Sequence, residues 1–200
     1  MTLTLIFAIF LFAVSATFTP GPNNVMLTAS GANFGFRKTM PHISGICIGF
    51  PVMVAAIGLG FGLVFEKYPL LHLVLKYVGA AYLLWLSWKI MTTRRAEEGN
   101  GQGRPLTFLQ AAAFQWVNPK AWIMAVSAVS TYTSVQGNVF FEVAIITALF
   151  ASVSFPSAST WTLIGVGLGR VLNDPGKLKI FNIVMGLLLV ASIVPILWAG

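Results

Sequence analysis

The stretch TFTPGPNNVML, residues 17–27, lies inside a run of 36 residues, Met1 to Phe36, that carries no charge. Such a run predicts a membrane helix, because about 20 consecutive apolar residues cross the hydrocarbon core of a bilayer. Pro20 and Pro22, however, each remove a backbone donor, and Gly21 between them is a poor helix former. The sequence therefore predicts a helix that enters the membrane and breaks inside it.

The composition of the whole chain also points to a membrane. Of the 200 residues, 57% are hydrophobic and 8% are charged, whereas soluble domains carry about 25% charged residues. Further charge-free runs cover residues 39–65, 121–141, 143–169 and 180–200. We therefore expect an all-α integral membrane protein, with residues 1–200 forming a single transmembrane domain in the lipid bilayer.

Six spans are predicted, at about residues 3–30, 40–65, 69–91, 106–131, 140–168 and 179–198. With Lys120 set aside, nine Lys and Arg residues follow the first, third and fifth spans, and two lie on the opposite side. Because loops rich in Lys and Arg stay in the cytoplasm, we expect the loop at 93–105 to be cytoplasmic and both termini to lie outside.

The cysteine count and the charge exclude several other functions. Cys47 is alone in the chain, so it can form no internal disulfide and no cysteine-based metal cluster. The net charge of +7 is explained by the basic connections between spans, so we expect no nucleic-acid partner. No Asp lies inside a span, and Ser and His show no catalytic spacing. We therefore expect no enzyme, no metal site and no cofactor.

Two segments 107 residues apart resemble each other. IGLGFGLVF at residues 57–65 aligns with IGVGLGRVL at 164–172, and Gly79 meets Gly186 at the same offset. The glycines predict close helix packing through small residues. A unit of three spans crosses the membrane an odd number of times, so its second copy must run upside down. We therefore predict two inverted three-helix repeats, at about residues 1–92 and 106–200, a design that many secondary transporters share.

The fourth span contains a break that matches the first. AAFQWVNPKAWIMA, residues 112–125, places Asn118, Pro119 and Lys120 well inside the span. Each break frees carbonyls that cannot face lipid, and each begins a half-helix whose first amides form the positive end of a dipole. We expect the broken helices one and four to face each other and to bind a zwitterion such as an amino acid. The predicted binding residues are Pro20, Gly21, Pro22, Asn23, Asn24, Gln115, Asn118, Pro119 and Lys120.

Other interpretations of these residues remain open. The prolines could form packed kinks, the asparagines could only cap the breaks, and Lys120 could extend to a membrane interface. His42 and Glu142 are candidates for proton coupling, although His42 could instead cap a helix end. The small polar residues of SVSFPSAST, 152–160, could line the path of a substrate or only pack.

Three motifs, TPGPNN at 19–24, GANFGFRK at 31–38 and NPKAW at 118–122, resemble those of the LysE/RhtB family of bacterial amino-acid exporters, and the resemblance covers essentially the whole chain. It implies a multi-pass secondary transporter that exports amino acids or close derivatives across the bacterial inner membrane, driven by protons. YVGAAYLLWLSWKI and VSTYT are most similar to the members that export cysteine and O-acetylserine. The alternatives are a passive channel, a structural membrane subunit, or export of another small metabolite or ion, and a homo-oligomer is left open.

Overall fold

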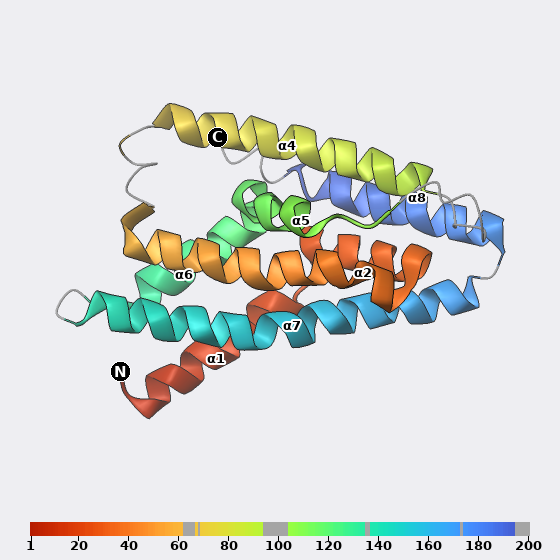
Figure 1. Cartoon of the computed structure of the whole chain (residues 1–200). Coiled ribbons are helices and arrows are strands. Elements are labelled where there is room, and N and C mark those ends of the chain that lie inside the picture. Colours follow the sequence, from red (N-terminus) through yellow and green to blue (C-terminus); the bar gives the residue numbers. More distant parts are fainter. Residues whose placement is uncertain (62–66, 68, 94–103, 135–136, 173, 195–200) are drawn as a thin grey trace.

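The structure, a computed structural model, describes residues 1–61, 67, 69–93, 104–134, 137–172 and 174–194. Every regular element in these ranges is helical, as predicted (Figure 1). The elements are α1 (Leu3–Phe18), α2 (Pro22–Ala56), the π-helix η1 (Ile57–Phe61), α4 (Pro69–Thr92), α5 (Phe108–Phe114), the 3-10 helix η2 (Gln115–Val117), α6 (Pro119–Tyr132), α7 (Val139–Val171) and α8 (Pro175–Ala191). Most of the predicted loop at 93–105, and the C-terminal ends of the predicted spans 40–65 and 179–198, lie outside the described residues.

The first and fourth predicted spans are each broken where the sequence places proline. α1 ends at Phe18 and α2 begins at Pro22. η2 ends at Val117, and α6 begins at Pro119 after an extended Asn118. Both prolines occupy the first position of the new helix, where the missing N–H would have no intrahelical partner. At each break one helix therefore ends and another begins, so neither break is a bend within a continuous helix.

α2 reverses direction at Gly35. This glycine has φ 78 and ψ 170, a conformation that only glycine adopts readily. Ser30 Oγ lies 3.3 Å from His42 Nδ1 although 12 residues separate them, a separation that would span about 18 Å in a straight helix. The two halves of α2 therefore run back alongside each other (Figure 1). The predicted connection between the first two spans, residues 31–39, is reduced to this one non-helical residue.

The first half of α2 packs closely against α7 (Figure 1). A Cβ atom at Gly31 would lie 2.2 Å from the carbonyl oxygen of Thr162, and one at Gly165 would lie 2.1 Å from that of Thr28. The two backbones can approach this closely only because neither position carries a side chain. The predicted packing role of the glycines at 164–172 is thus confirmed at Gly165, whereas Gly167 has open space around it.

The surface of the helices is apolar. Three described stretches, Pro22–Phe61, Leu73–Thr92 and Val139–Val171, are long and apolar enough to cross a membrane. Large hydrophobic side chains stand on the outside, including Leu3, Leu109 and Phe140, which are 82%, 74% and 74% exposed. Exposure of so many apolar side chains is unfavourable in water but favourable in the hydrocarbon core of a bilayer. The protein is therefore embedded in a membrane.

The ends of the helices that border the basic connections lie together. In Figure 1 the reversal of α2, the end of α4 at Thr92, the end of α7 at Val171 and the start of α8 at Pro175 all lie at the right of the view. Those basic residues of this side that the structure describes therefore lie at one end of the helices, which is called the basic end below.

Candidate functional site

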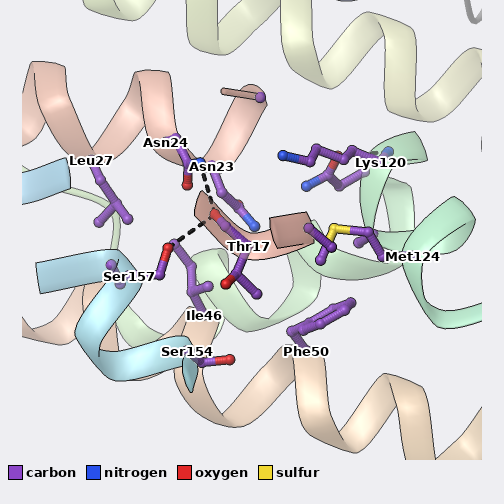
Figure 2. Close-up of a pocket in the computed structure, with 15 residues that line it drawn as sticks. Thr17, Asn23, Asn24, Leu27, Ile46, Phe50, Lys120, Met124, Ser154 and Ser157 are labelled. Atoms are coloured by element: carbon purple, nitrogen blue, oxygen red, sulfur yellow. Dashed lines mark hydrogen bonds between the residues drawn. The ribbon is translucent and has the colours of Figure 1, made fainter. Parts of the chain in front are cut away.

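The two breaks meet at a cavity of about 50 Å³ (Figure 2). Its apolar walls come from two separate hydrophobic clusters. Leu27 and Ile46 belong to one cluster, and Phe50 and Ala121 belong to the other. The cavity, called the central cavity below, therefore lies where the two halves of the core adjoin. The polar residues that line it are Thr17, Asn23, Asn24, Asn118, Lys120, Ser154 and Ser157.

Side chains satisfy the carbonyls that the first break sets free. Asn24 Nδ2 donates hydrogen bonds to the carbonyl oxygens of Thr17 at 3.0 Å and Thr19 at 2.8 Å. Ser157 Oγ of α7 donates a further bond to Thr17 O at 2.9 Å, and both bonds to Thr17 are drawn in Figure 2. Unpaired carbonyls are costly inside a membrane. Asn24 and Ser157 therefore hold the break open and keep α1 and α2 from rejoining as one helix.

A pair of amide side chains joins the first break to the fourth span. Asn23 Nδ2 donates to Gln115 Oε1 at 2.8 Å, and Gln115 Nε2 donates back to Asn23 Oδ1 at 3.2 Å. Gln115 is fully buried, and its Nε2 also donates to Ala111 O at 2.8 Å. The two breaks, which the sequence only predicted to face each other, are in direct contact.

Lys120 crosses from the second break to the first. Its Nζ donates to the carbonyl oxygens of Thr19 and Pro20, the latter at 3.3 Å. These carbonyls lie just beyond the C-terminal end of α1, where the helix dipole is negative. Among the described residues no carboxylate pairs with Lys120. An ammonium group has three donors, so one remains for a ligand.

Gly21 is the residue that makes room for this lysine. A Cβ atom at Gly21 would lie 2.5 Å from Cδ of Lys120. Gly21 is also the N-cap of α2, and it offers no side chain to cap the first turn. The backbone amides of Asn23 and Asn24 in that turn have no intrahelical partner. A positive dipole end and a lysine ammonium therefore adjoin the same cavity, which suits a carboxylate.

The structure divides the predicted binding residues into two groups. Gly21, Asn23, Asn24, Asn118 and Lys120 line the central cavity. Pro20, Pro22, Gln115 and Pro119 do not line it. Pro22 and Pro119 start the two half-helices, Gln115 holds Asn23, and Pro20 offers its carbonyl to Lys120. This second group positions the residues of the first.

The two candidates for proton coupling lie outside the central cavity. His42 is fully buried, and its Nδ1 contacts Ser30. Glu142 is 7% exposed, and its carboxylate accepts hydrogen bonds from Ser134 N at 2.8 Å and Ser134 Oγ at 3.0 Å. Glu142 therefore has local partners that explain its burial, whereas Nε2 of His42 has no hydrogen-bond partner among the described residues.

Several lining residues were not among the predicted binding residues. Ser154 and Ser157 come from the polar patch at 152–160, which the sequence had marked as a possible path lining. Thr17 lies two positions before the TPGPNN motif, and no feature of the sequence marked it as a binding residue. Phe50 and Met124 also line the cavity, and nothing in the sequence distinguishes them from apolar residues that face lipid.

Comparison with known proteins identifies relatives along the whole chain. The family described as LysE type translocator matches residues 14–194. Cysteine/O-acetylserine efflux proteins of Escherichia coli (strain K12) and Shigella sonnei (strain Ss046) are each 34% identical over 199 residues, covering 99% of this chain and 100% of the relative. No solved structure matches the chain significantly.

Proposed function

The chain belongs to the LysE type translocator family, and we propose that it exports cysteine, O-acetylserine or a close amino-acid derivative through the central cavity. It is a transporter and not an enzyme. The proposal includes the bacterial inner membrane as the location and the cytoplasm as the side from which the substrate is taken. It rests on the names of the relatives and on the chemistry of the cavity.

One observation carries the proposal: a lysine ammonium and the start of a helix adjoin one cavity. We expect the carboxylate of the substrate to accept hydrogen bonds from Lys120 and from first-turn amides of α2 near Asn23 and Asn24. The ammonium group of the substrate needs acceptors, and the hydroxyl oxygens of Ser154 and Ser157 line the same cavity. A zwitterion therefore finds partners for both of its charges.

The walls of the cavity favour a small side chain without charge. The volume of about 50 Å³ holds only a few water molecules, since each needs roughly 10–15 Å³. Phe50 and Met124 close one side (Figure 2), and no acidic side chain is among the described lining residues. A lysine or arginine substrate would have no partner for its cationic side chain, whereas cysteine and O-acetylserine need none.

The inverted repeat remains part of the proposal. It is supported by a proline-initiated break in each half of the chain and by the contacts between these breaks, Asn23 to Gln115 and Lys120 to Thr19. Transporters built in this way expose one central site to either side of the membrane in turn. We propose that the six spans work in this manner, with both termini outside.

Proton coupling is also proposed, and the geometry favours His42 over Glu142 as the coupling group. His42 is buried and has one ring nitrogen without a partner, while both carboxylate oxygens of Glu142 are engaged by Ser134. A group that takes up and releases a proton during transport must be able to change its hydrogen-bond partner. We therefore expect His42→Gln, and not Glu142→Gln, to remove the dependence of export on a proton gradient.

The test is uptake by everted membrane vesicles, offered a panel of labelled amino acids with and without a proton gradient. We expect saturable uptake of cysteine or O-acetylserine, stimulated by the gradient and absent from vesicles without the protein. Uptake that never saturates and shows no counterflow would identify a passive channel. Transport of none of the amino acids would overturn the proposal.

A further inference from the structure

A second cavity, of about 40 Å³, lies toward the basic end of the helices. Its polar lining consists of Ser30, Asn33, His42, Lys89, Thr93 and Arg104. Lys89 stands in the last turn of α4, and Arg104 precedes α5. None of these six residues lines the central cavity, so the second cavity is a separate feature of the molecule.

The charges around this cavity favour the binding of an anion. Lys89 and Arg104 are both cationic, and no acidic side chain is among the described residues that line the cavity with them. The ammonium of Lys89 lies 5.3 Å from the centre of the Trp85 ring, which holds it by a cation–π contact. Two cations beside one cavity repel each other unless an anion lies between them.

His42 gives independent evidence that the cavity is incomplete. The side chain is fully buried and lines the cavity, and its Nε2 has no hydrogen-bond partner among the described residues. Buried polar atoms in folded proteins are rarely left without a partner. A ligand or its bound water in this cavity would supply what His42 lacks.

The two cavities follow one another along the first half of α2. Asn23 and Asn24 line the central cavity, whereas Ser30 and Asn33 line the second. Seven residues of helix separate Asn23 from Ser30, which is about 10 Å. Between them Leu27 faces the central cavity and Met26 faces the second, and these side chains are 1% and 2% exposed. A buried apolar pair thus lies between the polar residues of the two cavities.

We propose that the second cavity is a loading site, in which Lys89 and Arg104 bind the carboxylate of the substrate before it passes Met26 and Leu27 to the central cavity. The proposal rests on the export function proposed above. An amino acid approaching from the basic end would meet Lys89 and Arg104 first, and Lys120 would take over its carboxylate at the next stage. Free phosphate or acetate offers the same anionic chemistry, and the experiment separates these sources.

The first test measures transport kinetics of Arg104→Gln at equal membrane abundance. Arg104 is exposed, so the substitution should not disturb folding. We expect KM for O-acetyl-L-serine in everted vesicles to rise roughly 10-fold, with the rate at saturation within about twofold of wild type, because a charge-assisted hydrogen bond is lost only in loading. Arg104→Lys should restore most of the affinity.

The controls locate the effect. Lys76→Gln removes a positive charge from the N-terminal half of the same helix, α4, and should leave KM unchanged. Counterflow in right-side-out vesicles, where substrate enters from the other side, should show no KM defect for Arg104→Gln. An unchanged KM in everted vesicles, with wild type active, would overturn the loading site alone. Inactive wild-type vesicles would instead overturn the proposed function.

The second test uses Trp85 as a reporter in purified protein. Binding of an anion at Lys89 should change the fluorescence of Trp85, so the wild-type signal minus that of Trp85→Phe should saturate with O-acetyl-L-serine. Its carboxamide should give no change. An equal response to phosphate or acetate at the same concentration would show a general anion site and overturn the assignment to substrate.

An internal carboxylate is the competing occupant. The sequence carries Glu97 and Glu98 between Lys89 and Arg104, outside the described residues. In the background E97Q/E98Q, Arg104→Gln should still raise KM by the same factor. Loss of that effect in this background would show that Arg104 acts on an acidic residue of the chain and would overturn the proposal.

Discussion

The side-chain amides of Asn23 and Gln115 hydrogen-bond to each other in both directions, at 2.8 and 3.2 Å, across 92 residues of sequence. We expect Asn23→Leu and Gln115→Met each to destabilise the protein by about 1–3 kcal/mol, because each leaves an amide without its partner inside the membrane. The double variant should lose clearly less than the sum, since it removes both partners together. Reversible unfolding in mixed micelles measures these differences.

The control for this double-mutant cycle of Asn23 and Gln115 is Asn182→Leu. Asn182 forms a similar reciprocal pair with Asn33, at 2.7 and 2.9 Å, and shares no partner with Asn23. The double variant N23L/N182L should therefore be additive within about 0.5 kcal/mol. Additivity of N23L and Q115M would contradict a direct link between the two breaks.

Removal of the Lys120 ammonium should damage transport more than folding. We expect Lys120→Met to weaken the apparent affinity for substrate by roughly 10- to 150-fold, since a hydrogen bond to a charged group is worth about 1.5–3 kcal/mol. The measurement is uptake by everted vesicles at matched protein abundance, with Lys76→Met as the control. Export at the wild-type level would show that Lys120 serves only to cap the carbonyls of Thr19 and Pro20.

Two glycines should respond to alanine in opposite ways. Gly21 has an extended backbone with φ −175, so the cost of Gly21→Ala is the contact of its Cβ with Lys120. That contact displaces the lysine, and we expect transport to fall while stability changes little. Gly35 has open space but φ 78, so Gly35→Ala should cost about 1–3 kcal/mol of stability and leave affinity unchanged. Thermal unfolding in detergent and vesicle uptake separate the two; equal transport by Gly21→Ala and wild type would contradict the role of Gly21.

The sequence was sufficient to predict both breaks, because proline adjoins asparagine at each of them. Proline alone would not suffice, since Pro41, Pro51 and Pro156 lie inside helices. The sequence also predicted the residue types that gather at the breaks. It could not identify the hydrogen-bond partners of these residues. Lys120 donates to the carbonyl of Thr19, 101 residues away, and Asn24 donates to the carbonyls of Thr17 and Thr19, which another nearby donor could equally have satisfied. Such partners depend on how the helices pack, which local sequence does not specify.

Apolar lining residues were beyond prediction for a different reason. In a soluble helix the buried face differs in polarity from the exposed face, so the period of the pattern reveals the core. In lipid both faces are apolar. Phe50, at 4% exposure, and Val52, at 54%, therefore look alike in sequence although only Phe50 lines the cavity. The polar patch at Ser154 and Ser157 was visible because it departs from that uniformity.

The orientation of the chain can be tested with single cysteines in a Cys47→Ser background. Thr2, Lys38 and Lys67 are all exposed, and the predicted spans place one crossing between Thr2 and Lys38 and another between Lys38 and Lys67. Because nine basic residues lie on the side of Lys38 and two on the other, that side should face the cytoplasm. A membrane-impermeant maleimide should label Thr2→Cys and Lys67→Cys in intact cells, and Lys38→Cys only in everted vesicles. The reverse pattern would overturn the orientation. Labelling of Thr2→Cys and Lys38→Cys from the same side would overturn the first crossing, and with it the odd number of spans per unit on which the inverted repeat depends.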